Sequence, residues 1–199
     1  MKRASFIFII IFISANYISS QTPKWVFDEE KNYEVPKGSC EWETLKTGDF
    51  FAEMQDFYQQ YPLQDTVMEE IAEILKTSIP EKSYISISIV FGAWCGDSRE
   101  YLPYFKKISD TLVEKYKVNQ ESTKYQYVLF GCDREKKTGI ETIDHNPVNE
   151  IAFVPTFIIS LITLSNDLTV EKSIYLGNIV ETPEASLEKD LLNIIKKVK

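Results

Sequence analysis

The chain has 199 residues, a length that fits one folded domain with extensions. Its 22 basic and 30 acidic residues give a formal net charge of −8, which argues against nucleic acid as a partner because phosphate backbones bind basic surfaces. With 44% hydrophobic and 26% charged residues, the composition is that of a folded domain and excludes a disordered tail.

The first 20 residues have the pattern of a secretory signal peptide, and we assign 1–20 to it. Lys2 and Arg3 precede an unbroken apolar run from Phe6 to Ile13, and small polar residues follow up to Ser20. Eight apolar residues are far fewer than the roughly 20 that cross a bilayer as a helix. We therefore expect an exported protein, periplasmic or secreted, with no stable membrane span after cleavage.

Residues 21–80 are predicted to form an arm followed by two helices. Residues 21–45 are polar and rich in turn residues, which indicates an arm wrapped over the surface. Apolar side chains recur at helical spacing in residues 48–61 and 65–78, and Pro62 ends the first of these helices. We expect both helices to pack on the core.

Residues 81–199 are predicted to form an α/β domain. Apolar residues alternate with others in 83–91, which indicates a strand, and helical spacing follows in 96–117. The further predicted elements are strands over 125–130, 154–164 and 168–175, one short helix within 134–151, and a last helix that begins at Thr182 and Pro183. Gly177 is expected to end the fourth strand, so the prediction is a central four-stranded mixed sheet.

The dipeptide Val154-Pro155 is unusual for the start of an interior strand. Proline has no N–H to donate to the sheet, so this position marks either a sheet edge or a cis peptide bond. A cis bond at such a place is usually a functional feature.

Four separated features resemble a thioredoxin. They are, in chain order, Trp94-Cys95-Gly96, Pro103, the sequence VPTF at 154–157, and Gly177. The resemblance covers about residues 83–198. Within the superfamily, WCGDS at 94–98, followed by DREKK at 133–137, VPTFI at 154–158 and GNIVETP at 177–183, is similar to exported thioredoxin-like proteins whose second cysteine is serine. This resemblance implies helices on both faces of the sheet and a cis proline, Pro155, beside the active cysteine.

Cys95 is the candidate catalytic residue. It stands where a strand gives way to a helix, and the unpaired N–H groups of a helix start favour a thiolate. Ser98 lies one turn further and can donate a hydrogen bond to the sulfur, but it cannot form a disulfide. Asp97 suits a helix start, yet its charge opposes a neighbouring thiolate. A mixed disulfide through Cys95 should therefore persist until an outside thiol resolves it.

The other two cysteines leave several pairings open. Three cysteines in an exported chain leave at least one thiol unpaired within it, and the possible internal pairs are 40 with 95, 40 with 132, and 95 with 132. Cys132 ends the second predicted strand, beside the first, so it is either a resolving thiol or a small buried hydrophobe. Cys40 could equally pair with Cys132 as a structural staple.

A substrate groove is expected around the sulfur, and no cofactor is expected. Trp94, Gly96, Val154 and Pro155 are its candidate residues, with the Val154 backbone pairing an extended substrate segment. Three scattered cysteines and one histidine show no metal-ligand spacing.

Two functions follow from these residues. The first is thiol-disulfide exchange through a single cysteine, on protein or low-molecular-weight thiol and disulfide substrates. The alternative is a non-catalytic peptide-binding or chaperone-like module that keeps the groove but has lost redox cycling.

Overall fold

The computed structural model describes residues 22–120, 122–145 and 151–198. These residues form one six-stranded mixed sheet in the order β1-β2-β4-β3-β5-β6. The strands are β1 (Lys24–Asp28), β2 (Tyr33–Cys40), β3 (Ser83–Phe91), β4 (Tyr125–Gly131), β5 (Thr156–Leu164) and β6 (Val170–Val180). The helices are α2 (Trp42–Leu45), α3 (Phe51–Gln60), α4 (Asp65–Thr77), α5 (Gly96–Glu114), α6 (Glu141–Asp144), α7 (Leu187–Ile195) and the 3-10 turn η1 (Lys196–Val198). The predicted signal peptide, 1–20, lies outside the described residues.

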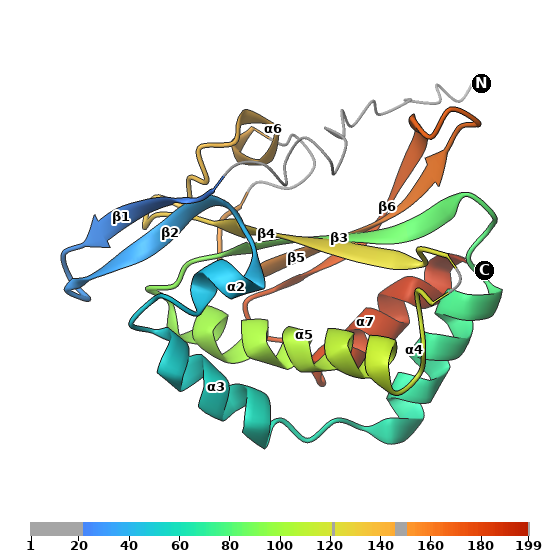
Figure 1. Cartoon of the computed structure of the whole chain (residues 1–199), viewed down its shortest axis with the longest axis horizontal. Coiled ribbons are helices and arrows are strands. Elements are labelled where there is room, and N and C mark those ends of the chain that lie inside the picture. Colours follow the sequence, from blue (N-terminus) through green and yellow to red (C-terminus); the bar gives the residue numbers. More distant parts are fainter. Residues whose placement is uncertain (1–21, 121, 146–150, 199) are drawn as a thin grey trace, which may run out of the picture.

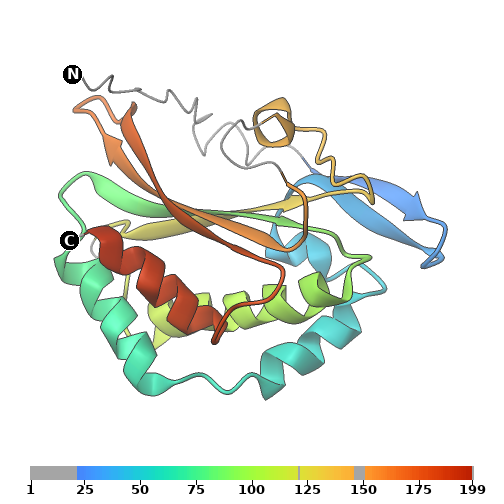
Figure 2. The ribbon, with the colours of Figure 1, turned by 180° about the vertical axis from the view of Figure 1, so that it is seen from behind.

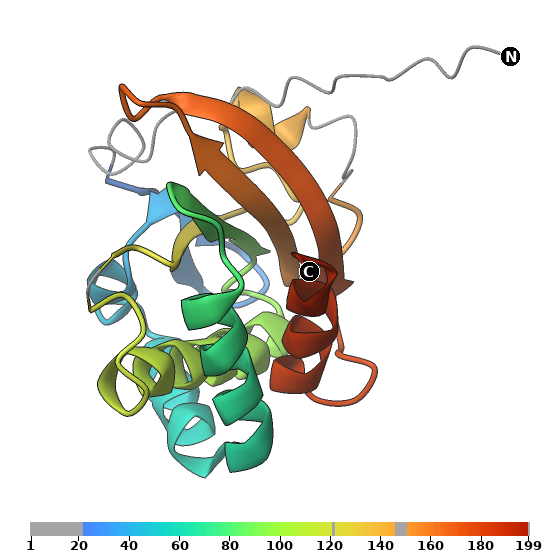
Figure 3. The same ribbon diagram turned by 90° about the vertical axis from the view of Figure 1, so that its right-hand side faces the viewer.

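The helices are distributed unevenly over the two faces of the sheet. Helices α3, α4, α5 and α7 form a layer on one face, and α6 lies on the other (Figures 1 and 2). The sheet curves around the helical layer (Figure 3). Helices were expected on both faces, but in the described part of the chain the second face carries a single helix of four residues.

The centre of the sheet follows the sequence prediction. Strand β3 pairs in parallel with β4 and antiparallel with β5, and β6 pairs antiparallel with β5. The alternating isoleucines of β3 are at most 4% exposed, because they pack against the helical layer. Strand β3 therefore has the bounds that the alternation predicts, and it delivers its carboxyl end to the start of α5.

The prediction of a four-stranded sheet and a surface arm is wrong, because residues 21–45 supply β1 and β2. Strand β2 changes partner along its length: residues 33–37 pair with β1, and residues 38–40 pair with β4. Pro36 is tolerated because it lies in the half that pairs with β1 alone. At Gly131 an added Cβ would lie 2.2 Å from the Pro36 carbonyl oxygen, so this glycine lets β2 cross closely over the end of β4.

The two early helices pack on the core as expected, α3 on α5 and α4 on α7. Several predicted boundaries differ from the observed ones, most of all the end of β6 and the start of α7. Strand β6 continues through Gly177 to Val180, because a bulge at Leu176 absorbs the irregularity opposite Ile159 and Ser160. Helix α7 begins at Leu187 and not at Thr182 or Pro183, with Ser186 as its N-cap residue.

No helix in the described ranges is both long and apolar enough to cross a membrane.

Candidate functional site

Cys95 lies at the start of α5, directly after the turn that leaves β3. Its backbone N–H donates to the Gly92 carbonyl (2.8 Å), and its extended backbone makes it the N-cap of a helix that begins at Gly96. The residue is partly exposed. Its side chain makes no capping hydrogen bond, although the first N–H groups of the helix lack intrahelical partners.

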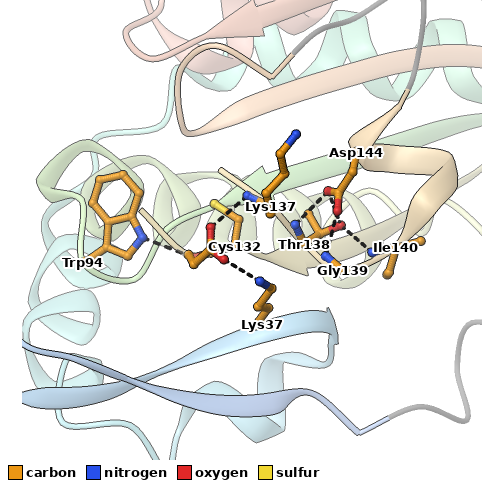
Figure 4. Close-up of polar contacts among 9 residues, drawn as sticks. Lys37, Trp94, Cys132, Lys137, Thr138, Gly139, Ile140 and Asp144 are labelled. Atoms are coloured by element: carbon orange, nitrogen blue, oxygen red, sulfur yellow. Dashed lines mark hydrogen bonds and ion pairs between the residues drawn. The ribbon is translucent and has the colours of Figure 1, made fainter. Parts of the chain in front are cut away.

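The Trp94 indole folds back over this turn. A Cβ on Gly92 would lie 2.6 Å from the indole Cε2, so a glycine is required beneath the ring. Trp94 Nε1 donates to the Cys132 carbonyl (3.1 Å), as Figure 4 shows. The ring is therefore anchored and half-buried next to the sulfur.

The peptide bond Val154-Pro155 is cis, and it lies against the thiol. The Cys95 thiol donates to the Val154 carbonyl (3.3 Å), a contact between residues 59 positions apart. Val154 and Pro155 are buried, whereas Phe153 just before them is 52% exposed. The structure thus decides between the two alternatives for Pro155, and it brings this proline and Cys95 together.

Ser98 has a different partner from the expected one. Its side chain is 1% exposed, and its hydroxyl accepts from the Gly92 N–H (3.2 Å). Within the described residues no hydrogen bond joins it to the Cys95 sulfur. Asp97 is half-buried in the first turn of α5, and Gly96 is exposed with open space where a Cβ would stand. Ser98 therefore fixes the turn before the cysteine.

Cys132 is buried beside the site. Its N–H donates to the Phe91 carbonyl (2.9 Å), and its side chain packs in one cluster with Val154 and Cys95. Burial raises the pKa of the Cys132 thiol to about 12, and the carboxylate of Asp133 adds to the shift. Cys132 is thus close to the turn that carries Cys95 but is mostly a neutral thiol near neutral pH.

Cys40 is buried on β2 and does not pair with Cys132. All three cysteines are free. Cys40 lies opposite Leu129, three residues before Cys132, which is about 10 Å along a strand and beyond the reach of a disulfide. Burial raises the pKa of the Cys40 thiol to about 12. The staple left open by the sequence is therefore not formed.

The loop after Cys132 is held by specific polar contacts (Figure 4). Asp133 forms an ion pair with Lys37 of β2 and accepts from the Lys137 N–H (3.0 Å). Burial acts to raise the pKa of Asp133, but these two partners hold it below its ordinary value. Asp144 accepts from the backbone N–H of Thr138 at 2.7 Å. The loop is thus bound to the hairpin formed by β1 and β2, through Lys37, and to α6, through Asp144.

Two residues near the site were not singled out from the sequence. Tyr33 on β2 donates to the Ala93 carbonyl (3.1 Å), and the Arg134 guanidinium lies 5.2 Å from the centre of the Trp94 ring. Arg134 falls within the DREKK sequence that the resemblance contained. Tyr33 was missed because its segment was interpreted as a surface arm, and no local pattern indicates its contact with the Ala93 carbonyl.

No cluster of His, Cys, Asp and Glu side chains suitable for a metal ion occurs in the part of the chain that the structure describes.

Comparisons with known proteins give no family. No protein-family model matches the chain, and no curated protein matches it. A solved protein of unknown function from Pseudomonas aeruginosa is similar with 15% identity and a TM-score of 0.47, covering 75% of this chain and 86% of its own. An HIV epitope-scaffold is similar with 13% identity and a TM-score of 0.44, covering 74% and 85%. Likeness at this level assigns neither an activity nor a partner.

Proposed function

We propose that this chain is an exported, thioredoxin-like protein that carries out thiol-disulfide exchange through Cys95 alone. The observation that carries the proposal is the contact of the partly exposed Cys95 sulfur, at a helix start, with the carbonyl that precedes cis Pro155. The strand order β4-β3-β5-β6, with α5 after β3, supports the thioredoxin-like assignment. Trp94 and the Val154 backbone would border the substrate.

The exchange requires one sulfur on the protein. The Cys95 thiolate attacks a substrate disulfide, forms a mixed disulfide with one half, and releases the other half as a thiolate. A low-molecular-weight thiol then attacks the mixed disulfide, which restores Cys95 and leaves its own sulfur joined to the substrate. Ser98 cannot perform this second attack. Cys132 is 0% exposed, and its raised pKa makes it a slow resolving thiol.

Trapping of the mixed disulfide tests this function. The mature chain is incubated with oxidised glutathione and with a disulfide-containing protein, and the products are identified by mass spectrometry under non-reducing conditions. We expect one adduct, on Cys95, that is absent from Cys95→Ser and still present in Cys132→Ser. An unmodified Cys95, or labelling spread equally over the three thiols, would contradict the proposal.

A second candidate is a non-catalytic peptide-binding module. It is favoured by the use of the Ser98 hydroxyl to hold Gly92, which leaves no partner for redox cycling one turn from the thiol. Under this alternative, Cys95→Ser retains its protein partners. Loss of all partners in that variant decides for the exchange reaction.

A further inference from the structure

A closed ring of hydrogen bonds surrounds the peptide that carries Cys95. The Tyr33 hydroxyl, on the first residue of β2, donates to the Ala93 carbonyl (3.1 Å) and accepts from Arg99 Nη1 (2.9 Å). The Arg99 backbone N–H in turn donates to the Cys95 carbonyl (3.2 Å). The ring therefore ties both sides of the Trp94-Cys95 segment to a strand 60 residues away.

The position of the Tyr33 hydroxyl is itself fixed. The Tyr33 ring packs on Phe50 with 6.1 Å between ring centres. Arg99 is 14% exposed, and its Nε lies 3.1 Å from a carboxylate oxygen of Glu53 on α3. Tyr33 and Arg99 are each positioned by a further contact, with Phe50 and Glu53 respectively. The Tyr33 hydroxyl therefore restrains the Ala93 carbonyl.

A second contact, from Arg134 in the loop after β4, reaches the next residue and depends on the β1–β2 hairpin. Arg134 lies over the Trp94 ring at 5.2 Å, and it donates two hydrogen bonds to Asp28 of β1, at 2.8 and 3.0 Å. The Asp28 side chain is 3% exposed, so this pair is well shielded from water on the carboxylate side. Adjacent residues, Ala93 and Trp94, are thus both held by contacts that depend on the hairpin.

We propose that the β1–β2 hairpin positions the reactive thiol, with Tyr33 as a positioning residue and Arg99 as its partner. The sulfur of Cys95 meets the Val154 carbonyl only if the preceding turn keeps its shape. The inference rests on the proposed function in taking Cys95 as the reacting group, but the restraint on the turn exists independently of any reaction.

Tyr33→Phe is the direct test, because it removes the hydroxyl and keeps the ring on Phe50. Tyr58→Phe is the matched control: its hydroxyl donates to Asp110 (2.9 Å) between α3 and α5, away from the turn. We expect amide hydrogen exchange in residues 92–96 to accelerate about fivefold in Tyr33→Phe and to stay unchanged in the control. We also expect the pH profile of Cys95 alkylation to move in Tyr33→Phe, with a rate change of about threefold near neutral pH. Wild-type exchange and an unmoved profile in Tyr33→Phe would overturn the inference.

Arg99→Lys gives a second, independent variant. Lysine keeps the charge beside Glu53 but lacks the planar fork that reaches the Tyr33 hydroxyl. Because both substitutions break one ring, the double variant should exchange no faster than the faster single variant. If the two increases in exchange rate multiply in the double variant, Tyr33 and Arg99 do not act as one unit, and the inference is overturned. If wild-type Cys95 forms no mixed disulfide, the proposed function fails, whereas the exchange comparison still decides the positioning role.

Discussion

The two hairpins at opposite ends of the sheet differ in what they contact (Figure 1). The β1–β2 hairpin reaches the turn that carries Cys95 through Tyr33, and it reaches the loop after Cys132 through Lys37. The tip of the β5–β6 hairpin bonds chiefly within itself, where Ser165 contacts Thr169, and its Leu168 is 73% exposed. The comparison teaches that the hairpin added at one edge of this sheet contacts the turn that carries Cys95, while only the base of the β5–β6 hairpin, next to Pro155, lies near the site and its tip is peripheral.

The largest expected effect comes from closing the space beneath the β1–β2 hairpin. In Gly131→Ala the new Cβ would meet the backbone oxygen of Pro36 at 2.2 Å, and neither backbone can move without breaking strand pairing. We expect a loss of about 3 kcal/mol or more in the free energy of unfolding, measured with urea. Gly96→Ala is the control, because nothing lies within 4 Å of its Cβ position. Equal free energies of unfolding for the two variants would contradict the close crossing of β2 over β4.

Side-chain truncation in the two hairpins should give smaller losses of stability that still differ between them. Val35 on β2 is 2% exposed, and Val35→Ala should lower the free energy of unfolding by about 2 kcal/mol. Leu168→Ala at the exposed tip of the other hairpin should cost less than about 0.5 kcal/mol. Similar losses in the two urea titrations would contradict the view that β2 is packed and that the tip of the β5–β6 hairpin is peripheral.

Acid should loosen the β1–β2 hairpin selectively. The hydrogen bond from Arg134 holds the pKa of Asp28 below its ordinary value of 3.8. A depressed folded-state pKa stabilises the fold above the ordinary value, and this stability is lost as the pH falls through the lowered value. We expect the protection of β1 amides, measured relative to the intrinsic exchange rate at each pH, to fall between about pH 4 and pH 2, and Asp28→Asn to show lower protection that no longer changes with pH in this range. A wild-type hairpin that is insensitive to acid would show that this ion pair contributes nothing.

The smallest effect is expected at the reactive thiol when the far hairpin is changed. Leu168→Ser should leave the alkylation rate of Cys95 within about 1.5-fold of wild type, because the tip has no contact with the turn. Alkylation followed by peptide mapping measures this rate, with Tyr33→Phe as the variant that should differ. A large change in Leu168→Ser would mean that the two ends of the sheet are coupled.

The parts of the fold that were predicted correctly depend on local signals. The alternation in residues 83–91 predicted β3, and the helical spacing in 65–78 predicted α4, because side-chain periodicity reflects burial on one face. The β1–β2 hairpin was missed because Pro36 and Gly38 are turn residues in most contexts. Gly38 has a positive φ of 107° at the point where β2 changes partner, a role that no local pattern reports.

The candidate site divides in the same way. Cys95, Trp94 and Pro155 were identified from the sequence, and the structure brings them together. The partner of Ser98 was predicted wrongly as the Cys95 sulfur, because a buried hydroxyl bonds to whichever backbone group the turn presents to it. Tyr33 was not predicted either, since its contact depends on strand pairing.

The sequence by itself determined that one cysteine stands where a strand gives way to a helix, with a serine one turn further that cannot form a disulfide. Only the tertiary structure decided which carbonyl faces the sulfur, that Cys132 is buried and that β2 supports the turn. The physical reason is range: capping and periodicity act over a few residues, whereas these contacts join segments about 40 to 60 residues apart and depend on how the whole sheet packs.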